Sequence, residues 1–232
     1  MKKSKSLSAS PSGSETVWGL VWLAFQFVLL PPLLQWVNAQ LSRPFSGSEL
    51  NFCYYLVCFL AVFCIFHKYL GRSLAQVKNH PAYFLQAVVL GLAAYVACRA
   101  LVGEGLRLFF PWFSNKNDAA IAKLAGSGYF LTMIGTVLLV PPVEECLFRG
   151  LIFRNLYGKS RWAAYLISMA VFAFIHLLGH LSAYSPLGLL LAFFQYLPAG
   201  LCLAWGYAKS DTIFAPMVIH AIINAMAIWA MR

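Results

Sequence analysis

Long apolar segments separated by short polar ones dominate the pattern of hydrophobic and polar positions along the chain. Each segment is close to the roughly 20 residues that an α-helix needs to cross the hydrocarbon core of a bilayer. The pattern predicts an all-α protein, a polytopic transmembrane helix bundle of about seven spans, with six to eight as the range. The segments lie at 17–37, 50–70, 82–102, 128–142, 162–179, 186–207 and 212–231.

Composition agrees with this pattern and excludes a soluble domain. Hydrophobic residues make up 61% of the 232-residue chain, charged residues only 10%, and the mean hydropathy is +0.74. The one doubtful span is the segment that ends at Pro141 and Pro142. Because the residue before a proline is pushed out of helical geometry, we expect a kink or stop there, with a second helix starting near Pro142.

Three regions follow from the polar stretches between the apolar segments. Residues 1–16, rich in Ser and Lys, are predicted to be a disordered tail on the cytoplasmic side. Residues 17–127 would hold the N-terminal transmembrane helices and an interfacial segment at about 103–127 on the outer face. Residues 128–232 would form the functional helical core. The six cysteines all fall inside predicted spans, so a disulfide framework is not expected.

The net charge of +10 is spread unevenly and indicates orientation. Basic residues gather in loops on alternate sides of the predicted spans, which places those loops and the N-terminus in the cytoplasm. The expected partner is therefore the lipid bilayer, and no nucleic acid is implied. The basic residues concerned are Lys2, Lys3, Lys5, Lys68, Arg72, Lys78, Arg154, Lys159, Arg161 and Lys209.

Charged residues inside the apolar stretch 138–153 are the first sign of chemistry, because charges in lipid are costly and usually functional. Glu145 and Arg149 are spaced i, i+4, the favourable order for an ion pair on a helix. Glu144 lies about 100° around the axis, so it would stay free and face a cavity. In the alternative interpretation, both acids serve only to neutralise Arg149.

Further polar side chains in other spans favour a site over a purely structural role. His176 lies mid-span, and His220 with Asn224 lies at i, i+4 in the last segment. Glu144 is a candidate general base, His176 could help to hold a water molecule, and His220 with Asn224 could donate to an oxyanion. This set suits amide hydrolysis by activated water. Since Lys159 and its basic neighbours mark the cytoplasmic end, we expect access to the site from that end.

The three motif segments resemble those of the CPBP intramembrane proteases, the family that includes the CAAX prenyl endopeptidases and bacteriocin-immunity proteins. Glu144 to Arg149 resembles the EExxxR motif, Phe172 to His176 the FxxxH motif, and His220 to Asn224 the HxxxN motif. The resemblance covers about Gly128 to the C-terminus.

The resemblance implies a function and roles for the motif residues. Glu144 with His176 would activate water, and His220 with Asn224 would form the oxyanion site. Glu145, Arg149 and Phe172 would be structural or positioning residues. The implied substrate is a peptide or protein, lipidated or membrane-embedded near the cleavage point. The implied location is a bacterial cytoplasmic membrane.

Two alternatives remain open at the level of sequence. Glu144, His176 and His220 are also legitimate zinc ligands, which would make the protein a metalloprotease. No cofactor is favoured, however, because the glutamates lie outside an H-E-x-x-H motif and Asn224 is a poor zinc ligand. A non-enzymatic membrane protein of the bacteriocin-immunity type could also retain the whole motif set.

Overall fold

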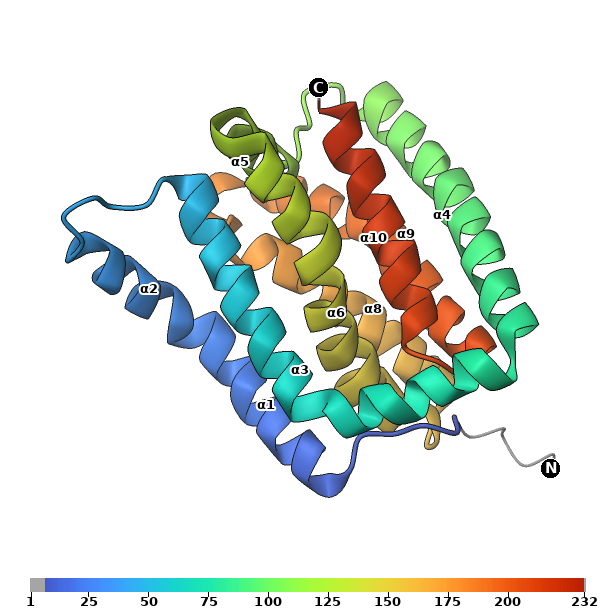
Figure 1. Cartoon of the computed structure of the whole chain (residues 1–232). Helices are drawn as coiled ribbons and strands as arrows, with labels where there is room; N and C mark the ends of the chain where they lie inside the picture. The colour runs from blue at the N-terminus through green and yellow to red at the C-terminus, as the bar shows by residue number, and fades with distance from the viewer. Residues whose placement is uncertain (1–6, 232) are drawn as a thin grey trace.

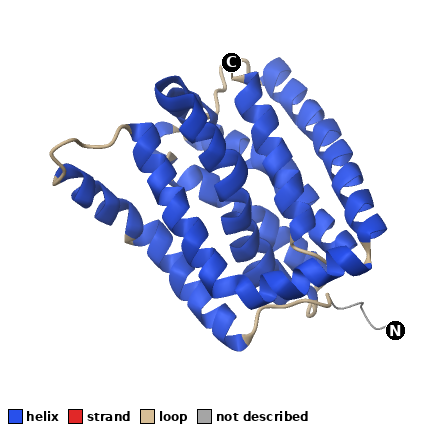
Figure 2. Ribbon diagram, viewed as in Figure 1, coloured by secondary structure: helices blue, strands red, loops and turns tan. Residues whose placement is uncertain are grey.

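Helices make up nearly all of residues 7–231, the part of the chain that this computed structural model describes, and no strand occurs among them (Figure 1, Figure 2). The expected all-α class is confirmed. In chain order the elements are α1 (Gly13–Val28), α2 (Leu30–Ala39), α3 (Gly47–Asn79), α4 (Pro81–Phe109), α5 (Lys116–Ile134), η1 (Gly135–Leu139), α6 (Val140–Glu145), η2 (Cys146–Phe153), α7 (Arg154–Tyr157), α8 (Arg161–Leu178), η3 (Leu181–Ala183), α9 (Pro186–Ser210) and α10 (Phe214–Ala230).

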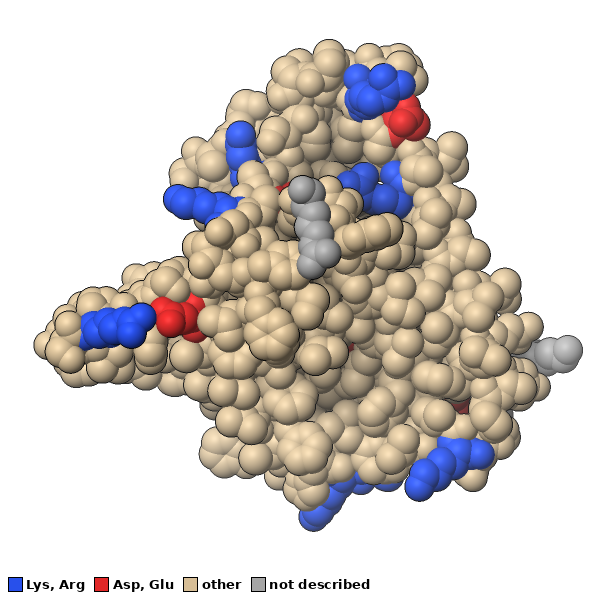
Figure 3. Space-filling model, turned by 45° about the horizontal axis from the view of Figure 1, so that its top comes forward, with Lys and Arg blue, Asp and Glu red and all other residues tan. Residues whose placement is uncertain are grey.

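Five helical stretches in the described residues are long and apolar enough to cross a membrane: α3, α4, the continuous stretch Lys116–Tyr157, α8 and α9. The bent pair α1 and α2 gives a sixth candidate, and α10 is a shorter apolar helix. Large apolar side chains such as Leu101 and Trp162 are exposed, and most of the surface visible in Figure 3 carries no charge. The protein is an integral membrane protein, and the number of helical segments agrees with the expected polytopic bundle.

Two predicted spans differ in shape from simple helices. The first is bent by 49° between α1 and α2. Pro31 and Pro32 lie in the first turn of α2, where their missing N–H groups interrupt the hydrogen-bond ladder of the preceding helix. The second, α3, extends to Asn79, and its C-terminal part turns along the lower end of the bundle in Figure 1. The basic loop expected after residue 70 is therefore helical.

The N-terminal residues 7–12 lie against the lower end of the bundle. Leu7 and Ala9 are buried, and Arg154 donates hydrogen bonds to both of their carbonyl groups. The backbone N–H of Ser8 donates to Asp211 Oδ1 at 2.7 Å. Residues 13–16 already form the first turn of α1, begun by a capping box between Ser12 and Glu15. The expected disordered tail is thus wrong for residues 7–16, while residues 1–6 lie outside the described part.

The polar stretch 103–127 is divided among three elements. It contains the end of α4, a short loop at 110–115 and the first part of α5. Asn115 caps α5 by accepting hydrogen bonds from the backbone N–H groups of Asn117 and Asp118. This loop lies at the upper end of the bundle, near the C-terminus and opposite the N-terminus (Figure 1).

The functional core is built around the long stretch from α5 to α7. The sequence predicted a kink or a stop at Pro141 and Pro142, and the helical stretch does not stop there. Instead the helix widens into the π-helical turn η1, and α6 then begins with both prolines in its first turn. α9 packs against α4 and α8, while α10 packs against α4, α6 and α9. These contacts bring the three motif segments, on α6 with η2, α8 and α10, into the interior.

Candidate active site

Glu145 lies at the centre of a buried ionic cluster. Its Oε1 atom accepts hydrogen bonds from Arg149 Nη1 at 3.1 Å and from His220 Nδ1 at 2.8 Å. The side chains of Glu145 and Arg149 are fully buried, and Arg149 Nη2 also donates to the Gly200 carbonyl at 3.1 Å. The expected i, i+4 pair is present. The hydrogen bond from His220 was not expected, because nothing in the sequence indicates which span faces Glu145.

Phe172 forms an aromatic wall beside this cluster. The Arg149 guanidinium lies 4.6 Å from the centre of its ring, a cation–π contact. The rings of His176 and His220 lie 4.5 Å and 5.7 Å from it, centre to centre. Phe172 therefore contacts three of the motif side chains at once; its positioning role stays a prediction.

Glu144 is separate from the ionic cluster, as its position on the helix predicts. Its Oε2 atom lies 4.0 Å from His176 Nε2 and 4.0 Å from His220 Nε2. Both separations are too long for direct hydrogen bonds. Oε2 is buried and has no hydrogen-bond partner among the described residues. A buried carboxylate oxygen without a partner is costly, so this atom is a strong candidate for binding a further molecule.

The hydrogen bonds of the two histidines decide which ring nitrogen faces Glu144. His176 Nδ1 lies 2.8 Å from the Phe172 carbonyl, which can only accept, so this nitrogen carries the proton. His220 Nδ1 donates in the same way to the Glu145 carboxylate. When either ring is neutral, its unprotonated Nε2 is consequently the atom that faces Glu144.

Asn224 is held by a carbonyl group that Pro141 leaves free. In η1, the N–H of Val140 donates to the Gly135 carbonyl, five residues back. The same spacing would pair the Thr136 carbonyl with residue 141, but proline has no N–H. Asn224 Nδ2 supplies the missing hydrogen bond to Thr136 at 2.8 Å. One amide hydrogen of Asn224 is thereby used, and the other remains available for a ligand.

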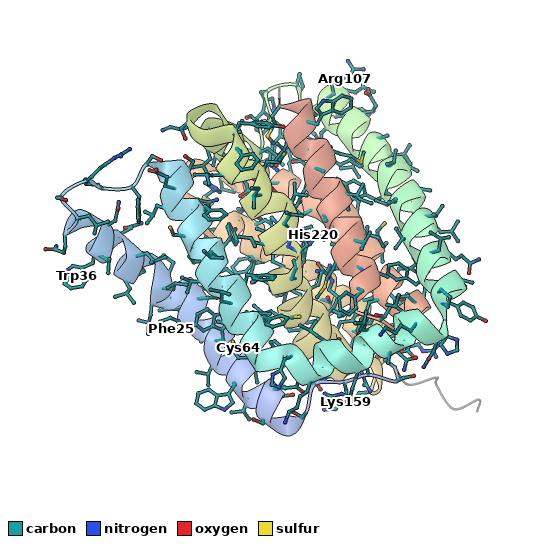
Figure 4. The ribbon with its side chains drawn as sticks, in the orientation of Figure 1. Phe25, Trp36, Cys64, Arg107, Lys159 and His220 are labelled. Carbon is teal, nitrogen blue, oxygen red and sulfur yellow. The ribbon has the colours of Figure 1, made fainter. Side chains whose placement is uncertain are left out.

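A cavity of about 370 Å³ joins these residues. Its inner end is lined by Glu144, Phe172, His176, His220 and Asn224. The structure thus brings the four proposed catalytic side chains to one cavity, with Phe172 beside them. Glu145 and Arg149 lie behind them. Figure 4 shows His220 inside the bundle, between the end that carries Arg107 and the end that carries Lys159.

The cavity extends toward one end of the bundle, and on its side it reaches Phe27 of α1 and Asn51 and Tyr55 of α3. Its outer lining includes Asn115, His180 and Met231, which belong to the end of the bundle where the C-terminus lies. No residue of the loop that carries Lys159 lines it. The expectation that the site is approached from the end with Arg154, Lys159 and Arg161 is therefore wrong. The charge pattern identified the ends of the spans but gave no information on where the interior is hollow.

The atoms around Glu144 Oε2 are farther apart than the ligands of a zinc ion. Ligand atoms at 2.0–2.1 Å from a tetrahedral zinc ion would be about 3.3 Å apart. The two 4.0 Å separations at Glu144 are longer. Two partners of one water molecule at about 2.8 Å and a roughly tetrahedral angle would be about 4.6 Å apart, so the observed separations lie between the two cases. Within residues 7–231, no group of three His, Cys, Asp or Glu side chains is arranged to hold a metal ion.

The chain is thus an all-helical membrane bundle with two glutamates, two histidines and an asparagine in or beside one cavity. Residues 126–226 match the model of the family described as type II CAAX prenyl endopeptidase Rce1-like. This range contains all three motif segments, and the resemblance that they indicated is confirmed for this part of the chain.

Two curated proteins are similar to the chain. The first, from Bacillus subtilis (strain 168), bears the name "Putative membrane peptidase YdiL"; it is 31% identical over 100 residues, which are 42% of this chain and 36% of that protein. The chain thus matches about a third of that relative. The second, an "Uncharacterized 24.3 kDa protein" from Escherichia coli, is 25% identical over 208 residues, 88% of this chain and 87% of that protein. No solved structure matches the chain.

Proposed function

We propose that this protein is an intramembrane endopeptidase that hydrolyses peptide bonds with a water molecule activated by Glu144. The observation that carries the proposal is the arrangement around Glu144 Oε2, a buried oxygen without a partner and 4.0 Å from two imidazole nitrogens. A water molecule bound there would contact the carboxylate that accepts its proton and a histidine that orients it. The match to the prenyl endopeptidase family supports the same reaction class.

The other polar side chains would serve the tetrahedral intermediate. His220, held by Glu145, directs Nε2 into the cavity, where its protonated form would donate to the developing oxyanion. Asn224, oriented through Thr136, has a second amide hydrogen for the same purpose. Water attacks the carbonyl carbon while Glu144 accepts its proton, which gives a tetrahedral intermediate. The C–N bond then breaks as Glu144 passes that proton to the nitrogen of the leaving amine.

The substrate class follows from the relatives and the setting. A cavity inside a membrane bundle suits a peptide segment close to the bilayer, either membrane-embedded or lipidated. The family model concerns enzymes for prenylated proteins, so a farnesylated CAAX peptide is the first probe. The two relatives are bacterial, which supports a bacterial cytoplasmic membrane as the location.

Glu144→Gln is the direct test of the proposal. It keeps the shape of the side chain and removes the base, so cleavage should be lost while the protein still folds. The measurement is a comparison of new protein N-termini in membranes from cells with the wild type and with the variant, together with cleavage of the farnesylated peptide. Glu104→Gln, at an exposed surface ion pair, is the matched control. Unchanged N-termini in the Glu144→Gln membranes would favour a binding protein of the immunity type.

Chelation distinguishes the water mechanism from the zinc alternative. Since the Glu144 spacing is longer than a zinc site needs, we expect turnover of purified protein to be unaffected by a strong chelator. The measurement is peptide cleavage before and after dialysis against the chelator, with and without added zinc. Loss of activity that zinc restores would assign Glu144, His176 and His220 as ligands.

A further inference from the structure

The orientation of His176 depends on few contacts of its own. Its Nδ1 atom donates to the Phe172 carbonyl, one turn earlier in the same helix, at 2.8 Å. Its Nε2 atom faces Glu144 at 4.0 Å without a hydrogen bond. A single hydrogen bond at Nδ1 permits the ring to tilt about that bond. The position of Nε2, which matters for the proposed water, therefore needs another restraint.

Tyr196 on α9 supplies a contact of the right kind. Its ring centre lies 4.6 Å from that of His176, with an angle of 31° between the two planes. The two rings are tilted against each other and close enough for direct contact. Together with Phe172, whose ring centre is 4.5 Å away, Tyr196 restricts the tilt of the imidazole. Both residues also line the cavity.

The Tyr196 hydroxyl is fixed in turn by the first turn of α5. Asn117 Nδ2 donates to it at 3.1 Å, and the hydroxyl donates to Asn115 Oδ1 at 3.2 Å. Asp118 Oδ1 is within 3.5 Å of the same hydroxyl. Asn115 is also the residue that caps α5. Tyr196 thus joins a rigid helix cap at the outer part of the cavity to a motif histidine at its inner end.

We propose that Tyr196 is a positioning residue for His176, which it holds by ring-to-ring contact while its hydroxyl is anchored to the α5 cap. The contribution of Tyr196 to catalysis rests on the proposed function. The orientation of the His176 ring, however, can be measured without any substrate. Nothing in the sequence marks Tyr196, because its contacts to residues 115–118 and 176 exist only in the folded bundle.

The test follows the reaction of each histidine with diethylpyrocarbonate in detergent-solubilised protein, by mass spectrometry of the modified peptides. This reagent acylates unprotonated imidazole nitrogens and needs no substrate. Tyr196→Leu should raise the modification rate of His176 several-fold and leave that of His220 unchanged, since His220 is held by Glu145 instead. Tyr196→Phe keeps the ring and loses the anchor, so its rate should lie between those of the wild type and the leucine variant.

Phe194→Leu is the matched control, because Phe194 is an aromatic residue of the same helix with half of its surface exposed. It should leave both histidines unchanged. An unaltered His176 rate in Tyr196→Leu would overturn the proposal, as would an equal rise at His176 and His220, which would indicate general loosening. A phenylalanine variant in which His176 is as reactive as in the leucine variant would contradict the role of the ring contact. Failure of the proposed function would appear separately, as persistent cleavage by Glu144→Gln.

Discussion

Two adjacent glutamates have opposite surroundings, and this difference is the basis of the site. Glu145 shares one carboxylate oxygen between Arg149 and His220, all deep in the bundle. The Oε2 atoms of both residues lack a hydrogen-bond partner among the described residues, but of the two only Glu144, the preceding residue, lines the cavity. A helix rotates successive side chains by about 100°, so neighbours in sequence can serve stability and chemistry separately.

Arg149→Ala should therefore destabilise the protein in a way that Glu144→Gln does not. Removing one partner of a buried ion pair leaves the other charge without compensation, at a cost of about 3–5 kcal/mol. The same loss is expected for Glu145→Ala. Thermal denaturation of the detergent-solubilised variants measures the difference. If Glu144→Gln lost as much stability as Arg149→Ala, both acids would belong to one structural cluster.

At the scale of elements, the stretch from α5 to α7 is unusual because it contains two π-helical segments, η1 and η2, on either side of the prolines. π-Helical turns are rare and often occur at functional sites. Here η1 leaves the Thr136 carbonyl free to accept a hydrogen bond from Asn224. Glu144 follows in α6, within one turn after Pro141. Pro141, which has no N–H, thus leaves a carbonyl group in η1 for the Asn224 side chain of α10.

A double-mutant cycle on Pro141 and Asn224 tests this link. Asn224→Ala leaves a partly buried carbonyl without a partner, which should cost about 1–3 kcal/mol of stability. In a Pro141→Ala background, residue 141 has an N–H that can donate to Thr136, so the cost of Asn224→Ala should be smaller. The free energy of unfolding of the four proteins gives the coupling. Strictly additive effects would show that Pro141 and Asn224 act independently.

The sequence predicted the parts of the fold that depend on local pattern. Apolar length identified the helical segments, and the i, i+4 spacing identified the Glu145–Arg149 pair. It missed the hydrogen bond from His220 to Glu145 and the ring contact of Tyr196 with His176, since both depend on how separate helices face each other. It also missed the direction of the cavity. A cavity depends on how several helices pack together, and the pattern of one segment does not predict that packing.

For the whole molecule, the two ends of the bundle have different properties. Lys159 and the helical segment with Lys68 and Arg72 lie at the lower end, whereas the cavity extends toward the upper end (Figure 1, Figure 4). Basic residues favour the cytoplasmic side. If that rule sets the orientation here, the site is reached from the opposite face of the membrane.

Cysteine labelling in intact cells measures this orientation. We expect a membrane-impermeant maleimide to label Asn117→Cys, at the outer part of the cavity, and to leave Lys159→Cys unlabelled until the cells are opened. Both variants should be made in a background without exposed Cys64. The reverse labelling pattern would place the cavity on the cytoplasmic side and show that the basic residues do not set the orientation.

The N-terminal segment has a consequence for the order of biosynthesis. Ser8 is bonded to Asp211, 203 residues later, and Leu7 and Ala9 are bonded to Arg154. A ribosome makes residues 7–9 before the helices from α1 to α9, and all of these precede Asp211. Residues 7–9 must therefore wait for their partner until the helices from α1 to α9 have been made. The N-terminal segment therefore reaches its final position late, when the part of the bundle that holds Asp211 has formed.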